Sequence, residues 1–199
     1  MKNGEFDKKK LLKPINMLNM YAQGAFPMAD EKGEIDWYQP KTRTIIPLDN
    51  YNVPRSLRKF MEKCEFNFTF SEKTMEIVNK CADRRETWIS PELIEAYKGI
   101  HEIGFLHSVE VYSKSKLIGG LFGITIGGAF FGESMFSKTS QASKTALIKL
   151  IERLNEKDFN LLDVQFTNPH LEMFGSTEID FNEYNDMLAV AYDKDVSFL

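Results

Sequence analysis

Two short stretches carry the polar side chains that are best placed to do chemistry. Asp163 and Gln165 stand two residues apart in the apolar run 161–166, and Glu133 stands among apolar residues in the run 129–136. Side chains two apart on a strand project from the same face, so Asp163 and Gln165 are expected to act on one group. A carboxylate in apolar surroundings costs free energy unless it has a partner or a task.

A third feature is the start of a helix expected near Ala142-Ser143-Lys144, because the N–H groups and positive dipole end of a helix suit an anion. Taken singly, each feature is better explained by structure alone: a satisfied buried acid, a hydrogen-bonded polar pair and an ordinary helix cap. Asp-x-Gln alone is a weak motif. The three together, on neighbouring elements and among many aromatic residues, favour a pocket.

A hairpin is expected to position Glu133. Gly127-Gly128 separates two apolar runs, and a glycine pair supplies the positive φ angles that a two-residue hairpin turn needs. On the second strand, alternation would place Phe131, Glu133 and Met135 on one face. The expected hairpin is followed by a helix and then by the strand that carries Asp163.

The rest of the chain alternates between helical and strand patterns. Helices are expected at 14–23, 54–64, 71–81, 90–104, 140–156 and from 180 onward, and further strands at 44–47, 66–70, 108–112 and 161–166. The segment 24–28 is interpreted as a loop. A shift in composition near residue 50 predicts a small N-terminal domain, 1–52, and a second domain, 53–199. The pattern indicates an α+β fold, a mixed β-sheet with flanking helices.

The composition is that of an ordinary globular protein with one core. The net charge of −4 gives no global sign of nucleic-acid binding, so such binding would need a local basic patch. The two cysteines and three histidines show no disulfide or metal-ligand spacing, and no P-loop or dinucleotide motif occurs. Neither a signal-peptide pattern nor a membrane-spanning run is present, which predicts a soluble cytoplasmic protein.

A series of motifs lies in one order along the chain from Tyr21 onward. They are GAFPM at 24–28, W-x-x-P-x-x-R at 37–43, CA at 81–82 with TWI at 87–89, AYKGIHEIGFLHSVE at 96–110, GGLFG at 119–123, GESMFS at 132–137, ASK at 142–144 and DVQ at 163–165. Together they resemble the leucyl/phenylalanyl-tRNA–protein transferase family. Many separate motifs in one order make this resemblance specific.

The resemblance implies an enzyme that moves Leu, Phe or less often Met from a charged tRNA to the N-terminal Arg or Lys of an acceptor protein, which marks that protein for N-end-rule degradation. It implies a GNAT-like C-terminal domain, no metal, no acetyl-CoA or other cofactor, and a monomer. Asp163 and Gln165 match the catalytic D-x-Q: Gln165 would sit against the acceptor α-amine while Asp163 orients and polarises it. Positioning and proton removal are the main demands, because an aminoacyl ester is already activated.

The resemblance also implies contacts for both parts of the aminoacyl-tRNA. Glu133 would contact the terminal adenosine or the aminoacyl α-amine, and Trp37 would stack on the adenine. The substrate-binding residues would be Trp37, Leu121, Phe130, Gly132, Glu133, Met135, Leu147 and Leu150. The candidate tRNA-phosphate contacts are Arg55, Arg58, Lys59, Arg84, Arg85 and Lys144.

Three alternative functions stay open on the sequence alone. A GNAT-like acyltransferase using an acyl-CoA is disfavoured, because the pyrophosphate-binding loop of that fold is missing from 138–143. A non-catalytic tRNA-binding protein is disfavoured by Asp163 and Gln165. A peptide-binding adaptor for basic N-termini would bind the acceptor without charged tRNA.

Overall fold

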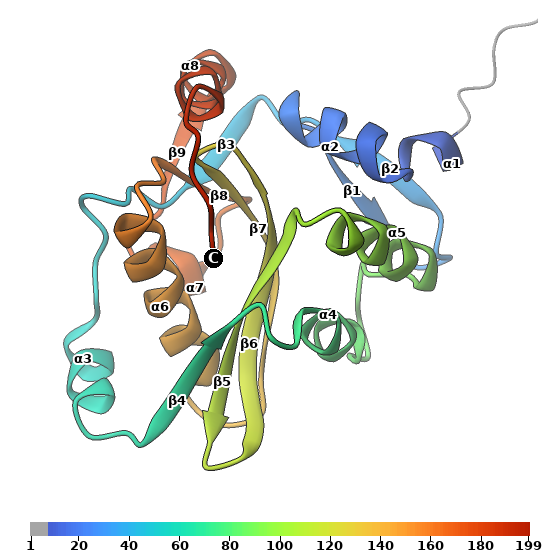
Figure 1. The fold of residues 1–199 in the computed structure, drawn as a ribbon. Helices are drawn as coiled ribbons and strands as arrows, with labels where there is room; N and C mark the ends of the chain where they lie inside the picture. The colour runs from blue at the N-terminus through green and yellow to red at the C-terminus, as the bar shows by residue number, and fades with distance from the viewer. Residues whose placement is uncertain (1–7) are drawn as a thin grey trace, which may run out of the picture.

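The computed structural model describes residues 8–199 of the chain as helices that cover a central sheet (Figure 1). The helices are α1 (Lys8–Leu11), α2 (Pro14–Ala22), α3 (Arg55–Met61), α4 (Thr74–Ala82), α5 (Pro91–Glu102), α6 (Ala142–Glu156), α7 (Pro169–Glu172) and α8 (Phe181–Tyr192). The strands are β1 (Phe26–Ala29), β2 (Ile35–Tyr38), β3 (Thr42–Ile45), β4 (Phe66–Phe70), β5 (Leu106–Ser113), β6 (Lys116–Ile126), β7 (Ala129–Ser137), β8 (Leu161–Gln165) and β9 (Thr177–Asp180).

Seven strands form one sheet in the order β4-β5-β6-β7-β8-β3-β9. Strands β4 to β7 are joined as antiparallel neighbours, and β3 lies antiparallel to both β8 and β9. Strands β7 and β8 pair in parallel, because α6 carries the chain back across the sheet between them. The predicted α+β class, with a mixed sheet and flanking helices, is confirmed.

Helices cover both faces of this sheet (Figure 1). One apolar cluster joins α2, α4, α5 and α8 to one face, and it includes Tyr97, Phe122 and Phe131. The other cluster joins α6 and α3 to the opposite face, and it includes Leu121 and Leu147. Strand β7 contributes residues to both clusters and is the fourth of the seven strands in the sheet.

The N-terminal part differs from its prediction in detail. The segment expected to be a loop, 24–28, contains most of β1, which pairs with β2 in a separate two-stranded sheet. Strand β3 belongs to the large sheet, although it lies on the N-terminal side of the predicted boundary after residue 52. That boundary stays a prediction. Within residues 8–199, no helix is both long and apolar enough to cross a membrane.

Side chains cap the starts of α5, α7 and α8. The Ser90 hydroxyl accepts the Leu93 N–H at the start of α5, and the Asp180 carboxylate accepts two N–H groups at the start of α8. The predicted start of a helix at residue 71 is wrong. Helix α4 begins after Lys73, and Ser71 adopts a positive φ of 58° in the turn that follows β4.

Candidate active site

The predicted hairpin is present, with Gly127 at a φ of 54° in its turn. Its second strand contains a β-bulge at Glu133: Ser134 pairs with Phe122 and Gly132 pairs with Gly123, so Glu133 is the extra residue. The prediction that Phe131, Glu133 and Met135 share a face is therefore wrong. Phe131 packs among α2, α4 and α5, whereas Met135 packs on the α6 face.

Strands β7 and β8 separate directly after Asp163. Their parallel pairing ends at Phe131 and Asp163, one residue before Gly132 and two residues before Gln165. Gln165 adopts a φ of 67°, a left-handed conformation that is strained for a non-glycine residue. The bulge on one strand and the left-handed residue on the other turn the two strands apart and leave a gap at the centre of the sheet.

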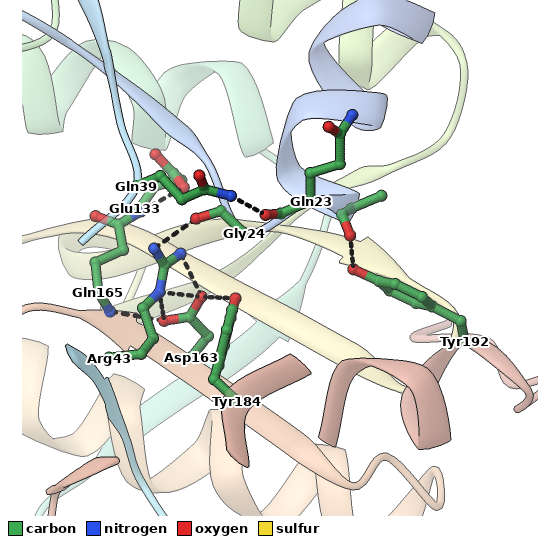
Figure 2. Close-up of polar contacts among 10 residues, drawn as sticks. Gln23, Gly24, Gln39, Arg43, Glu133, Asp163, Gln165, Tyr184 and Tyr192 are labelled. Atoms are coloured by element: carbon green, nitrogen blue, oxygen red, sulfur yellow. Dashed lines mark hydrogen bonds and ion pairs between the residues drawn. The ribbon is translucent and has the colours of Figure 1, made fainter. Parts of the chain in front are cut away.

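Asp163 is the buried anchor of this gap, with no solvent exposure. Arg43 from β3 donates to both of its carboxylate oxygens, with nitrogen–oxygen distances of 2.6 to 3.0 Å, and the Tyr184 hydroxyl donates to Oδ2 at 2.7 Å (Figure 2). The Gln165 backbone N–H donates to Oδ1 at 2.8 Å. An aspartate that accepts the N–H two residues onward holds a tight turn, which is why the D-x-Q spacing supports the strained Gln165.

Arg43 is as deeply buried as its partner, at 1% exposure. Its Nη1 atom donates to the Gly24 carbonyl at 2.8 Å, and its guanidinium lies over the rings of Phe26 and Tyr184. Burial is the largest influence and lowers the pKa of Arg43, but the charge and hydrogen bonds of Asp163, together with Tyr184 and Glu133, outweigh it and the pKa is raised. The pKa of Tyr184 is raised mainly by burial, so its hydroxyl stays protonated and donates.

Glu133 holds the side chain of Gln165. The Gln165 Nε2 atom donates to Glu133 Oε1 at 2.9 Å, and the Tyr97 hydroxyl donates to Glu133 Oε2 at 2.6 Å. Burial is the largest influence on Glu133 and raises the pKa of its carboxyl to about 7 from an ordinary 4.5, although the Tyr97 hydrogen bond works in the opposite direction. Glu133 is therefore poised between its neutral and ionised forms near neutral pH.

A cavity of about 300 Å³ opens where the two strands part. Most of its wall is apolar, and its polar lining residues are Arg84, Glu133, Ser134, Gln165, Asn168 and His170. The lining residues that the sequence predicted are Leu121, Gly132, Glu133, Met135, Leu147, Leu150 and Gln165. An apolar cavity with a few convergent polar groups is typical of a small-molecule site.

Two of the predicted substrate-binding residues lie outside the lining of this cavity. Phe130 is fully buried and packs against Phe198, because at its position β7 and β8 are still paired. Trp37 lies on β2 and packs against the core cluster of the α2 and α5 face. Their contacts with substrate stay predictions.

Several lining residues were not predicted from the sequence. They are Met28, Arg84, Trp88, Phe122, Ser134, Leu162, Val164, Phe166, Asn168, His170 and Leu171; of these, only Arg84 had been singled out, as a tRNA contact. Trp88 lies in the TWI motif at 87–89, and this motif is the sequence feature that could have indicated a residue of the site. Arg43 was part of the W-x-x-P-x-x-R motif, but its partner lies 120 residues away, so no local pattern could reveal it.

The predicted tRNA contacts fall into two groups. Arg84 lines the cavity, and Lys144 lies at the start of α6 close enough to His170 to help lower its pKa. Arg85 is exposed in the same loop as Arg84. The other three, Arg55, Arg58 and Lys59, are exposed on α3, whose apolar contacts are with the α6 face of the sheet. Within residues 8–199, no group of three or more His, Cys, Asp or Glu side chains is arranged to hold a metal ion.

Solved structures resemble this fold at low sequence identity. L-PGS from Bacillus licheniformis aligns with a TM-score of 0.45 and 11% identity, over 79% of this chain and 52% of that one. A ribosomal-protein-alanine N-acetyltransferase from Brucella melitensis biovar Abortus 2308 aligns with a TM-score of 0.39 and 8% identity, over 54% of this chain and 85% of that one.

Sequence comparisons are much closer. The model of the leucyl/phenylalanyl-tRNA protein transferase family matches residues 45–189, and the model of its N-terminal domain matches residues 12–41. A leucyl/phenylalanyl-tRNA–protein transferase of Herpetosiphon aurantiacus is 45% identical over 95% of this chain and 99% of the relative. One from Ruegeria sp. (strain TM1040) is 43% identical over 92% and 88%. The chain therefore belongs to the leucyl/phenylalanyl-tRNA–protein transferase family, and it is an aminoacyltransferase.

Proposed function

We propose that the chain moves leucine or phenylalanine, and less often methionine, from its charged tRNA to the N-terminal arginine or lysine of an acceptor protein, and that this marks the acceptor for N-end-rule degradation. Family membership supports aminoacyl-tRNA and a protein as the two substrates. One observation carries the chemical part of the proposal: Gln165 is held in a strained conformation at the wall of an apolar cavity.

The geometry supports Gln165 as the group that meets the attacking amine. Its Nε2 atom is engaged by Glu133 and its backbone N–H by Asp163, so the amide is fixed in orientation and its oxygen is left to accept an N–H from the acceptor α-amine. The amine nitrogen then attacks the ester carbonyl. A C–N bond forms, the C–O bond to the ribose breaks, and the proton lost by the amine ends on the ribose hydroxyl.

Asp163 acts through Gln165 in this proposal. The carboxylate is fully buried and is surrounded by the guanidinium of Arg43, the hydroxyl of Tyr184 and the N–H of Gln165. It orients Gln165 and polarises its peptide group without contacting either substrate. Asp163 is a positioning residue on this account, and Gln165 is the catalytic residue.

The apolar wall supports an aminoacyl side chain of the leucine, phenylalanine or methionine type. Leu121, Met135, Leu147 and Leu150 line the cavity from three elements, β6, β7 and α6. Apolar pockets discriminate only modestly between side chains that differ by a few carbon atoms. A cavity of this kind fits an enzyme that accepts these three residues alike.

The test is transfer of radiolabelled leucine or phenylalanine from charged tRNA to a peptide with N-terminal arginine. The same peptide with an acetylated N-terminus serves as the acceptor control. Gln165→Ala is expected to lower kcat about a hundredfold or more, the usual effect of losing a proton-transfer or orienting group. Asn67→Ala, exposed on the edge strand β4, is the matched control. Transfer to the acetylated peptide, or full activity in Gln165→Ala, would contradict the proposal.

A further inference from the structure

A second cavity, of about 450 Å³, adjoins the active-site cavity. The two share Arg84, Met135 and His170 in their walls, so they lie side by side. The remaining lining residues of the second cavity, called here the basic groove, are Lys80, Asp83, Phe136, Ser137, Lys138 and Ser143. The mechanism proposed above uses none of them.

The basic groove carries an excess of positive charge on a protein whose net charge is −4. Lys80 comes from the last turn of α4, Arg84 from the loop after it and Lys138 from the segment after β7, and Asp83 opposes them. The pKa of His170 is lowered, first by burial and then by Lys144, so this ring is neutral at pH 7. Three cations against one carboxylate select for an anionic ligand.

Arg84 lies at the junction of the two cavities. Its Nη2 atom donates to the Ser134 hydroxyl at 3.2 Å and to the Met135 carbonyl, and both acceptors belong to β7 just beyond the bulge. A guanidinium has five N–H donors, so these bonds fix its position and leave donors for a ligand. An anion that bridges the cavities would meet Arg84 first.

One further side chain at the junction, His170, suits a phosphate oxygen. His170 lines both cavities, and its Nε2 atom is buried without a hydrogen-bond partner among residues 8–199. The first turn of α6 borders the groove at Ser143. The Ser143 N–H is already accepted by the Ser137 hydroxyl, so the charge of the groove resides in its side chains.

We propose that the basic groove binds the phosphodiester that joins the terminal adenosine of the tRNA to the preceding nucleotide. This inference rests on the proposed function, which places the aminoacyl ester of the terminal adenosine in the active-site cavity. The backbone leaves that cavity past Arg84, and its first phosphate lies between Arg84, Lys80 and Lys138. Contacts to phosphate carry no sequence information, so the groove sets the position of the ester for every tRNA alike.

The inference also separates the basic residues of the molecule into two classes. Arg84, Lys80 and Lys138 serve the last phosphodiester, close to the reacting ester. Residues of α3 such as Arg58, which borders a separate cavity with Glu62 and Glu152, do not serve it. Any contact between α3 and the tRNA involves nucleotides farther from the reacting ester.

The test uses a matched pair of minimal donors: a dinucleotide carrying a phenylalanyl ester on its terminal adenosine, with either a normal phosphodiester or an uncharged methylphosphonate linkage. The readout is the ratio of KM for the uncharged donor to KM for the charged donor. Removing one ion pair at an exposed site weakens binding by up to about fivefold. Lys80→Gln combined with Lys138→Gln is therefore expected to reduce this ratio roughly tenfold.

The control is Lys63→Gln combined with Lys98→Gln, which removes the same charge from exposed positions that line neither cavity. An unchanged ratio in the groove variant, or an equal change in the control, would overturn the inference. Calorimetric titration with the same two dinucleotides lacking the phenylalanyl ester measures their dissociation constants. The ratio of these constants reports on the groove without any transfer. Failure of transfer in the wild type would therefore count against the proposed function, while the binding ratio would still decide the groove.

Discussion

Replacing Glu133 by glutamine should change the pH dependence of stability in a defined direction. Glu133 is 8% exposed, and burial raises the pKa of its carboxyl to about 7 in the folded protein, against 4.5 in an unfolded chain. Glutamine has nearly the same shape, can accept the Tyr97 hydroxyl and can pair with the Gln165 amide. The substitution therefore removes the ionisation while it keeps the packing.

The size of the effect follows from linkage. Below pH 4.5 the carboxyl is protonated in both states, so it does not affect the unfolding equilibrium. Between pH 4.5 and 7 the folded protein binds the proton more tightly than the unfolded chain, and the free energy of unfolding falls as the pH rises. The difference between the two pKa values, at 1.36 kcal/mol per pH unit, corresponds to about 3 kcal/mol.

Urea denaturation of the wild type and Glu133→Gln, at several pH values from 4.5 to 8, measures this difference directly. The free energy of unfolding of the variant, relative to wild type, should rise by about 3 kcal/mol across that range. Glu95→Gln, exposed on the same helix as Tyr97, should show no such trend. A relative stability of Glu133→Gln that stays constant from pH 4.5 to 8 would refute the argument that Glu133 is buried and weakly acidic.

Three further predictions concern the buried anchor, the hairpin and the cavity. Arg43→Met leaves the Asp163 carboxylate without its cation and should lower the free energy of unfolding by about 3 to 5 kcal/mol, whereas Asp163→Asn in the Arg43→Met background should recover part of that loss in urea denaturation. Gly123→Ala should cost about 1 to 3 kcal/mol in the same measurement, because its added carbon would lie 2.3 Å from the Phe131 carbonyl oxygen; a neutral effect would contradict the tight hairpin. Leu150→Phe narrows the cavity and should shift the ratio of kcat/KM for leucine over phenylalanine roughly tenfold towards leucine, a ratio that would not move if the aminoacyl side chain bound elsewhere.

Local patterns in the sequence were enough to predict most elements of the large sheet and to bring the central polar residues together. The Gly127-Gly128 turn and the apolar runs beside it give the hairpin, and the structure joins Glu133, Asp163 and Gln165 through hydrogen bonds. Each of these signals depends on residues that are near one another in the chain.

The features that the sequence did not reveal depend on distant partners. The bulge at Glu133 is defined by its pairing with β6, and a single strand read by itself alternates without interruption. The burial of Arg43 follows from an ion pair with a residue 120 positions away, and a lone arginine after a proline-containing segment resembles a surface residue. Trp88 and Trp37 cannot be ranked as cavity residues from sequence, because their positions depend on how α4 and the two-stranded sheet pack.

The anchor at Asp163 has a consequence for the synthesis of the enzyme. Asp163 is bound by Arg43, by Gln165 two residues along the chain and by Tyr184 of α8 (Figure 2). Arg43 in turn donates to the Gly24 carbonyl. A ribosome must release residues 24 to 184 before these groups can meet. A nascent or truncated polypeptide that lacks α8 therefore leaves the Asp163 carboxylate without one of its donors.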